Sequence, residues 1–222
     1  VQIGLAEKFY WDFAGEVPLI LKLNGKTDIP SDAEALSPVN ATVADAVRLG
    51  ADAVGYTLYV GSPAQGADFA QLRQVRQDAM RSGMPLIVWA YPRGAAIEAK
   101  GGKDSFYAVD YAARTASELG ADVVKVNFPK PERRTQVKPP YDGEFSSQRA
   151  IDAVVRSANR TMVLVSGGSK AGDEAMLTKA RQSMEAGATG LIFGRNVWQR
   201  PYEESLRFID QLKDILAKYP ST

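Results

Sequence analysis

The sequence predicts an α/β protein whose sheet is parallel and curls into a barrel. Six apolar, β-branched segments each precede a segment of helical periodicity, at a spacing of roughly 30 residues. Three helix-to-strand joints are near-copies, LGADAV, LGADVV and AGATGL, in which a glycine ends the helix and a buried strand follows at once. This repetition favours a (β/α)8 TIM barrel, with a doubly wound sheet as the competing fold.

The expected elements begin with a helix and then repeat as strand and helix. Within residues 1–15 apolar side chains recur on one helical face, and Gly15 is expected to end that helix. Residues 26–38 form a polar loop, and Thr42 is the expected N-cap of the next helix. The predicted strands are 19–23, 52–60, 84–90, 122–128, 161–165 and 189–193, and the helices that follow them are 43–49, 68–81, 107–119, 147–157, 173–186 and 202–219.

An eight-stranded barrel needs eight strand–helix units, and the sequence contains six. It also begins directly in a helix. We therefore expect residues 1–222 to be a single (β/α) barrel domain whose first two units belong to a missing N-terminal segment. A truly incomplete barrel is the alternative.

Composition excludes several kinds of chemistry. The 222 residues are 45% hydrophobic and 24% charged with a net charge of +1, which gives no reason to expect nucleic acid or an acidic membrane as a partner. There is no Cys or His, so thiol nucleophiles, Ser-His triads and imidazole or thiolate metal sites are excluded. We expect no cofactor and no metal. The lack of a membrane-length apolar run or a signal-peptide layout predicts a cytoplasmic protein.

Lys125 is the first candidate for catalysis. It interrupts the apolar strand DVVKVNFP, where an ammonium is costly to bury without a partner. Such a lysine is either ion-paired or kept neutral by burial as an amine nucleophile, with the desolvation supplied here by the neighbouring valines.

Aromatic and basic residues follow the third strand in the segment WAYPRG. Tyr91 and Arg93 are expected at the rim of the barrel, with Trp89 on the same side of the strand as Tyr91. The aromatic pair either packs the barrel mouth or makes Tyr91 the phenol acid or base that a chain without His needs.

Glycine turns follow the fifth and sixth strands. Ser166, Gly167 and Gly168 end one strand, and Gly194 and Arg195 follow the next. Glycines allow close backbone approach to an anion, and a phosphate site at the last two strands of a barrel is a recurrent arrangement.

Lys22 is a second lysine inside an apolar strand. It is either a snorkelling or ion-paired residue, or a substrate-binding cation that faces the same cavity as Lys125 and lowers the pKa of that amine by repulsion.

The segments LILKLNG, ADAVGYTLYVGS, VWAYPRG, ADVVKVNF, VLVSGG and GLIFGRNVWQR resemble the archaeal-type class I fructose-bisphosphate aldolases over residues 18–200. The resemblance implies a (β/α)8 barrel and a metal-independent lyase of carbohydrate metabolism, acting in glycolysis or gluconeogenesis on a sugar phosphate. It implies imine formation at Lys125 and proton transfer by Tyr91. It further implies substrate binding by Trp89, Arg93 and the two glycine turns, and a homo-oligomer.

The chain departs from the family pattern in two places. Its first two strands, which should carry an aspartate near the imine, are not in the sequence, and the segment 130–145 is longer and more basic than expected. Three functions remain open: the bisphosphate aldolase; a related imine-forming aldolase or transaldolase, such as a 2-amino-3,7-dideoxy-D-threo-hept-6-ulosonate synthase; and a non-catalytic sugar-phosphate-binding barrel.

Overall fold

A computed structural model describes residues 1–130, 137–168 and 172–219 of the chain. Their six strands form one parallel sheet in the sequential order β1-β2-β3-β4-β5-β6. A doubly wound sheet would reverse its strand order at a switch point, so the sequential order excludes that alternative. The strands are β1 (Ile20–Lys22), β2 (Ala53–Leu58), β3 (Leu86–Ala90), β4 (Val123–Asn127), β5 (Met162–Ser166) and β6 (Gly190–Ile192).

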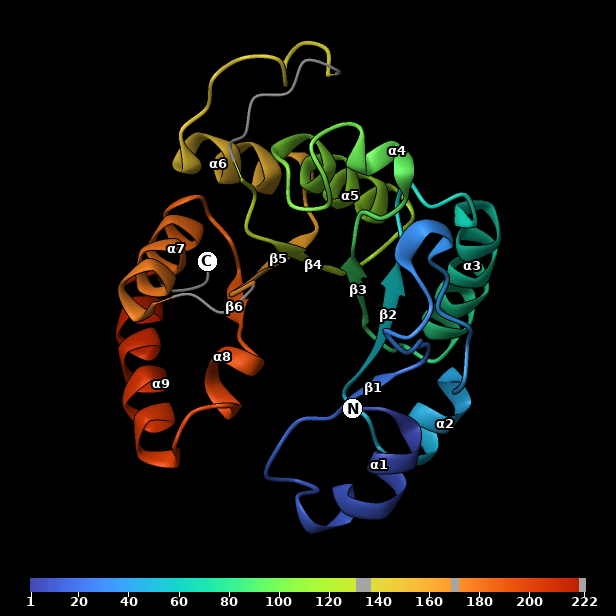
Figure 1. Cartoon of the computed structure of the whole chain (residues 1–222). Coiled ribbons are helices and arrows are strands. Elements are labelled where there is room, and N and C mark those ends of the chain that lie inside the picture. Colours follow the sequence, from blue (N-terminus) through green and yellow to red (C-terminus); the bar gives the residue numbers. More distant parts are fainter. Residues whose placement is uncertain (131–136, 169–171, 220–222) are drawn as a thin grey trace.

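The sheet curls into an open arc, and the long helices lie along its outer side, whereas the short helix α8 (Arg195–Trp198) lies on its inner side (Figure 1). Each long helix returns the chain from one parallel strand to the next, as parallel pairing requires. Within the described residues no helix combines the length and apolar character of a membrane span. The helices are α1 (Ile3–Phe9), α2 (Val43–Arg48), α3 (Gln65–Arg81), α4 (Ala95–Glu98), α5 (Phe106–Glu118), α6 (Ser147–Ser157), α7 (Asp173–Glu185), α8 (Arg195–Trp198) and α9 (Tyr202–Leu216).

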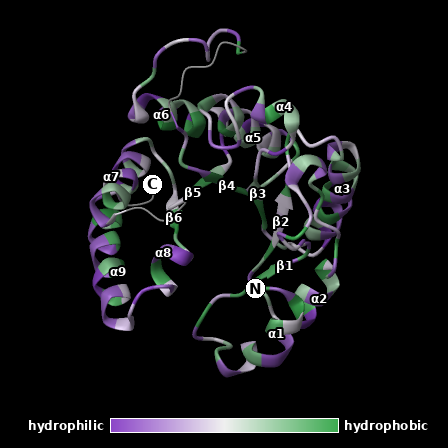
Figure 2. Cartoon of the chain, viewed as in Figure 1, coloured by the Kyte–Doolittle hydropathy of each residue, from purple (hydrophilic) through white to green (hydrophobic). Residues whose placement is uncertain are grey.

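The two faces of the sheet lie in different environments. Side chains alternate along each strand, so residues such as Val124 and Val126 of β4 face the helices and are fully buried in the main core. Lys125 and Asn127 then face the inside of the arc. Figure 2 shows apolar colour along the middle strands and polar colour on the outer sides of α3, α7 and α9. The core therefore lies between sheet and helices, which leaves the concave side available for polar residues.

Side-chain caps fix the starts of three of the helices. Thr42 and Asp45 form a capping box at α2, as the sequence predicts for Thr42. Ser105 accepts from Ala108 N–H at α5, and Ser146 accepts from Arg149 N–H at α6.

The first predicted helix is too long, and its end at Gly15 is wrong. The α-helix stops at Phe9, whose φ of −130° is not helical, and a 3-10 turn over Tyr10–Asp12 follows. Only Ala6 of α1 is buried, so little packing compensates for the weak helix propensity of the aromatic run after it.

Three short helical elements were not predicted. They are α4, α8 and a 3-10 turn at Asp32–Glu34 within the loop expected over residues 26–38. Each is four residues or shorter, too short to show an apolar period. Residues 131–136 of the basic segment 130–145 lie outside the described part of the chain.

Candidate active site

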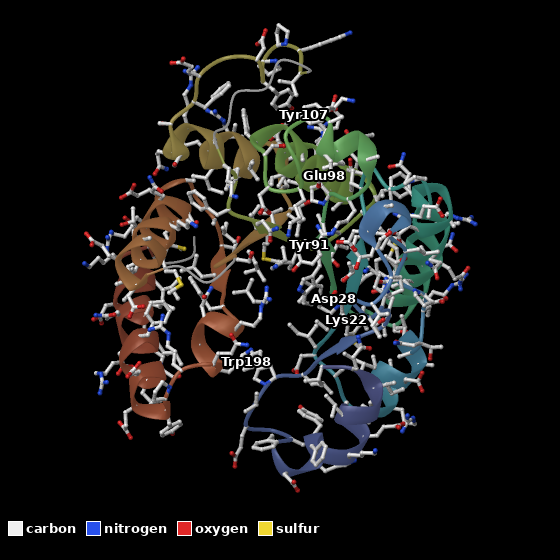
Figure 3. All side chains as sticks on the ribbon, viewed as in Figure 1. Lys22, Asp28, Tyr91, Glu98, Tyr107 and Trp198 are labelled. Atoms are coloured by element: carbon white, nitrogen blue, oxygen red, sulfur yellow. The ribbon has the colours of Figure 1, made fainter. Side chains whose placement is uncertain are left out.

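The carboxyl ends of the strands surround a cavity of about 850 Å³ on the concave side of the sheet. Parallel strands place these ends at one edge, so residues distant in sequence meet there. Figure 3 shows Tyr91 and Lys22 on this concave side, whereas Glu98 and Tyr107 lie among helices α4 and α5. All but one of the residues singled out from the sequence line the cavity: Trp89, Tyr91, Arg93, Lys125, Ser166, Gly167, Gly168, Gly194 and Arg195.

Lys125 occupies the middle of β4, opposite Trp89 of β3. Its side chain lines the cavity, and only 7% of the residue's surface is exposed. Its pKa is lowered to about 7, mainly by burial and also by the positive charges of Arg93 and Arg195, while the Asp104 carboxylate acts in the opposite direction. A large fraction of this amine is therefore neutral near pH 7, the form that attacks a carbonyl.

The desolvation of Lys125 comes from the cavity wall more than from the adjacent valines. Val124 and Val126 alternate to the helix face of the sheet and do not cover the amine. Tyr91 covers it instead: the Lys125 amine lies 4.4 Å from the centroid of the Tyr91 ring and is hydrogen-bonded to the Tyr91 hydroxyl. The expectation of a buried amine is met, by contacts across strands.

Tyr91 lies just after β3 and is partly buried. Burial raises its pKa to about 12, although Arg93 and Arg195 act in the opposite direction. The phenol therefore holds its proton at neutral pH and can give it to an adjacent atom.

Arg93 connects the end of β3 to the loop after β1. Its Nε donates to Asp32 Oδ2 at 2.7 Å, and its Nη1 donates to the Pro92 carbonyl at 2.8 Å. Lys26 forms a salt bridge with the other oxygen of Asp32 at 2.8 Å. Arg93 and Lys26 therefore share the one carboxylate of Asp32. These contacts hold the loop at the cavity wall, and the three residues together keep a net positive charge.

The two predicted glycine turns lie side by side. Gly167 N–H donates to the Ile192 carbonyl at 3.2 Å, and Asn196 Nδ2 donates to the Gly168 carbonyl at 3.3 Å. A Cβ on Gly167 would come within 2.5 Å of the Phe193 ring, so only glycine permits this approach. Because its N–H is already used, Gly167 shapes the turn, and Gly168, Gly194 and Arg195 are the candidate anion donors at this end.

Lys22 is not among the residues that line the cavity. Its amine donates to both the carbonyl (2.8 Å) and the side-chain oxygen (2.7 Å) of Asn24, and lies 5.5 Å from the Trp89 ring centroid. Burial lowers its pKa to about 7, with Asp68 acting in the opposite direction. The cations that lower the pKa of Lys125 are Arg93 and Arg195, so the role given to Lys22 as that cation has no support here.

Sequence reasoning missed several polar lining residues, among them Asp28, Asp32, Asp104 and Asn127. Asn127 carried a usable signal, since it stands two positions after Lys125 on one strand and must share its face. The three aspartates lie in loops, and only tertiary contacts bring them to the cavity. Among the residues described, no group of three or more Asp or Glu side chains is placed to hold a metal ion.

Comparison with known proteins finds matches that cover most of the chain. The sequence profile of the DeoC/LacD family aldolases matches residues 2–200. The fructose-bisphosphate aldolase class 1 of Thermoproteus tenax is 40% identical over 216 residues, which are 97% of this chain and 73% of that protein. The 2-amino-3,7-dideoxy-D-threo-hept-6-ulosonate synthase of Halobacterium salinarum is 34% identical over 199 residues, 89% of this chain and 66% of the relative.

Comparison with solved structures also finds an aldolase that matches most of the chain. A solved archaeal fructose-1,6-bisphosphate aldolase, whose catalytic Lys is covalently bound to the carbinolamine intermediate of the substrate, superimposes with a TM-score of 0.81 at 39% identity. The match covers 97% of this chain and 76% of the other. The curled six-stranded sheet thus matches part of a (β/α)8 barrel.

Proposed function

The chain belongs to the DeoC/LacD family of aldolases, and from this membership we infer that it is a class I aldolase, a Schiff-base lyase. Its proposed reaction is the reversible cleavage of fructose 1,6-bisphosphate to dihydroxyacetone phosphate and glyceraldehyde 3-phosphate. The observation that carries this proposal is the buried Lys125 amine, with its pKa lowered to about 7, beside Tyr91 in a cavity that ends in two glycine turns.

The proposed reaction begins with attack of the neutral Lys125 amine on the ketone carbon of the substrate, which gives a carbinolamine. Loss of water from the carbinolamine leaves a protonated imine. The C3–C4 bond then breaks, its electron pair moves into the imine to form an enamine, and the C4 hydroxyl loses its proton as the aldehyde forms. Protonation of the enamine at C3 and hydrolysis of the imine release the second triose phosphate.

Tyr91 is the proposed proton carrier. With its pKa raised to about 12, the phenol first acts as an acid and gives its proton to the hydroxyl that leaves the carbinolamine. The resulting phenolate then takes the proton of the C4 hydroxyl. One residue thereby serves both steps in a chain without His.

The remaining residues have proposed binding roles. Gly168, Gly194 and Arg195 hold one phosphate through backbone N–H groups and the guanidinium. Arg93 reaches the second phosphate or the sugar hydroxyls from the opposite wall, and Trp89 forms the apolar side of the site. Lys22 supports Trp89 from behind.

Reductive trapping tests the proposal. Borohydride in the presence of dihydroxyacetone phosphate should add one reduced triose phosphate to the chain, located at Lys125 by mass spectrometry. Lys125→Met should show neither adduct nor turnover. Retained turnover in this variant would show that the mechanism is wrong.

The second candidate is imine aldol or transaldol chemistry on another phosphorylated keto compound. The similarity to the hept-6-ulosonate synthase of Halobacterium salinarum favours it, because specificity resides in loops that the shared fold does not fix. Both reactions use the Lys125 imine, so only a comparison of kcat/KM for fructose 1,6-bisphosphate and for other keto phosphates separates them.

The wider setting of the protein is also a proposal: a cytoplasmic homo-oligomer that acts in glycolysis or gluconeogenesis. The C-terminal helix α9 offers a candidate contact surface, since Tyr202 is 74% exposed and Leu206 is 40% exposed. Sedimentation analysis of the purified chain tests the oligomeric part.

A further inference from the structure

A chain of polar side chains crosses the cavity wall beside Lys125. Asn127 Nδ2 donates to Asp104 Oδ1 at 2.8 Å, and Ser166 Oγ donates to Asn127 Oδ1 at 2.9 Å. All three residues line the cavity. Asn127 pairs directly with Ser166 across the two strands, so the parallel register itself brings their side chains together.

Asp104 is fixed in place by the backbone. Its carbonyl accepts from Lys130 N–H at 2.7 Å, and the Lys130 carbonyl accepts from Phe106 N–H at 3.0 Å. These two bonds attach the turn before α5 to the segment that leaves β4. The turn that carries the Asp104 carboxylate is therefore attached to the segment that follows Lys125 and Asn127 in the chain.

The chemistry of the three groups sets the direction of every hydrogen bond between them. A carboxylate only accepts, so Asn127 must turn its NH2 toward Asp104. The amide oxygen then faces Ser166, and the Ser166 hydroxyl must give its one proton to Asn127. Ser166 is left with lone pairs alone for a substrate, and cannot donate to a phosphate while the chain is intact.

Resting on the proposed function, we propose that Asp104 is a positioning residue for the aldolase reaction. Through Asn127 it makes Ser166 a hydrogen-bond acceptor for a substrate hydroxyl, and it places a carboxylate in the cavity that receives the positive imine. The site is thereby matched to a hydroxylated keto phosphate, with the phosphate itself left to the glycine turns.

Charged and titratable groups around Lys125 come from several elements that border the cavity. The loop after β1 contributes Asp28 and Asp32, the end of β3 contributes Tyr91 and Arg93, the turn before α5 contributes Lys103 and Asp104, and α8 contributes Arg195. Of the carboxylates, Asp104 is the one that opposes the lowering of the Lys125 pKa. Removing its charge should therefore lower that pKa further.

The first test measures the pH dependence of borohydride trapping with dihydroxyacetone phosphate. In Asp104→Asn the midpoint should move to lower pH by about half a unit or more, because an opposite charge near the amine is lost. The control Asp210→Asn, on the exposed face of α9, should leave the midpoint where it is. An unmoved midpoint in Asp104→Asn would overturn the inference about its charge.

The second test is a mutant cycle on kcat/KM for fructose 1,6-bisphosphate. Ser166→Ala should lower kcat/KM by about 3–10-fold, the worth of one hydrogen bond. Asn127→Ala removes the amide that links Ser166 to Asp104 but keeps the Asp104 charge. In this background Ser166→Ala should lower kcat/KM by less than about twofold. An equal loss of kcat/KM on Ser166→Ala in both backgrounds would overturn the proposed hydrogen-bonded link from Asp104 through Asn127 to Ser166.

The parent protein separates the two levels of proposal. If it gives no borohydride adduct, the aldolase proposal itself fails. If it gives the adduct while the midpoint stays fixed and the cycle is additive, only the role of Asp104 fails. Circular dichroism shows whether Asp104→Asn folds. If it does not fold, the mutant cycle with Asn127→Ala still tests the proposed role of Asp104.

Discussion

Lys125 and Lys22 have similarly lowered pKa values but different surroundings. Burial lowers the pKa of both amines to about 7. The Lys22 amine donates hydrogen bonds to two oxygens of Asn24 and is not among the residues that line the cavity, whereas the Lys125 amine is hydrogen-bonded to the Tyr91 phenol and lines the cavity. Position relative to the cavity therefore distinguishes the two amines and favours Lys125 as the proposed nucleophile.

Tyr91→Phe should separate imine formation from turnover. The amine of Lys125 remains buried behind the ring, so borohydride trapping should persist, while loss of the positioned proton donor should lower kcat by about 10²–10⁴-fold. Stopped-flow assay of bisphosphate cleavage and mass spectrometry of the trapped protein measure the two effects. A parent-like kcat would remove Tyr91 from the proposed mechanism.

The buried lysines also predict how stability depends on pH. Each has a folded pKa near 7 and an unfolded pKa of about 10.4, so the unfolded chain binds more protons between these values and stability must rise with pH across that window. Each pKa unit corresponds to about 1.4 kcal/mol, so each lysine should add about 2–3 kcal/mol to the free energy of unfolding between about pH 7 and about pH 9.5.

Lys22→Met tests this dependence away from the cavity. Urea unfolding of the variant should show roughly half of the parent's rise in the free energy of unfolding between the two pH values, because one of the two lysines with a lowered pKa is removed. The control Lys213→Met, at an exposed position of α9, should keep the whole rise. A full rise in Lys22→Met would mean that Lys22 titrates normally.

At the scale of elements, strands were predictable to within two residues at either end, and the long helices nearly as well. Their apolar and β-branched composition, together with glycines such as Gly50, Gly120 and Gly187 that end the helices with positive φ, is a local signal. The site residues at strand ends followed from the same logic. What could not be read locally is which loop returns over the cavity: Asp32 and Asp104 reach it through contacts that span the fold.

Gly55 on β2 leaves room for the Trp89 indole on β3. A Cβ on Gly55 would lie 2.5 Å and 2.8 Å from two atoms of the Trp89 indole, and 3.2 Å from Cδ of Lys22. Gly55→Ala should push the indole into the cavity, raise KM for the bisphosphate and cost about 1–3 kcal/mol by overpacking. Steady-state kinetics and urea unfolding measure both effects.

Two further variants control for the change to alanine itself. Gly66→Ala lies in helix α3 and has nothing within 4 Å of the added Cβ. It should raise the free energy of unfolding by about 0.5–1 kcal/mol and leave KM unchanged. In a Trp89→Leu background, Gly55→Ala should add little further loss, because the colliding ring is gone. Equal losses with and without the indole would assign the effect to β2 alone.

At the scale of the whole molecule, the cavity depends on the curl of the sheet. Side chains from the loop after β1 and from α8, near the two ends of the arc, line one space of about 850 Å³ (Figure 1). A ligand held by the β5 and β6 turns should thus bind only the folded arrangement, and binding to the folded state raises the stability of the entire chain.

Inorganic phosphate should reveal this linkage without any catalysis. At about 100 times its Kd, phosphate should stabilise the protein by about 2.7 kcal/mol, and for a chain of this size each kcal/mol raises Tm by about 2–4 °C. Arg195→Gln should lose most of the shift, because the guanidinium is the strongest phosphate donor at the glycine turns. The control Arg81→Gln, whose side chain at the end of α3 is 74% exposed, should keep it. A full phosphate shift in Arg195→Gln would place the anion elsewhere, and the assignment of the two turns as the phosphate site would then have to be abandoned.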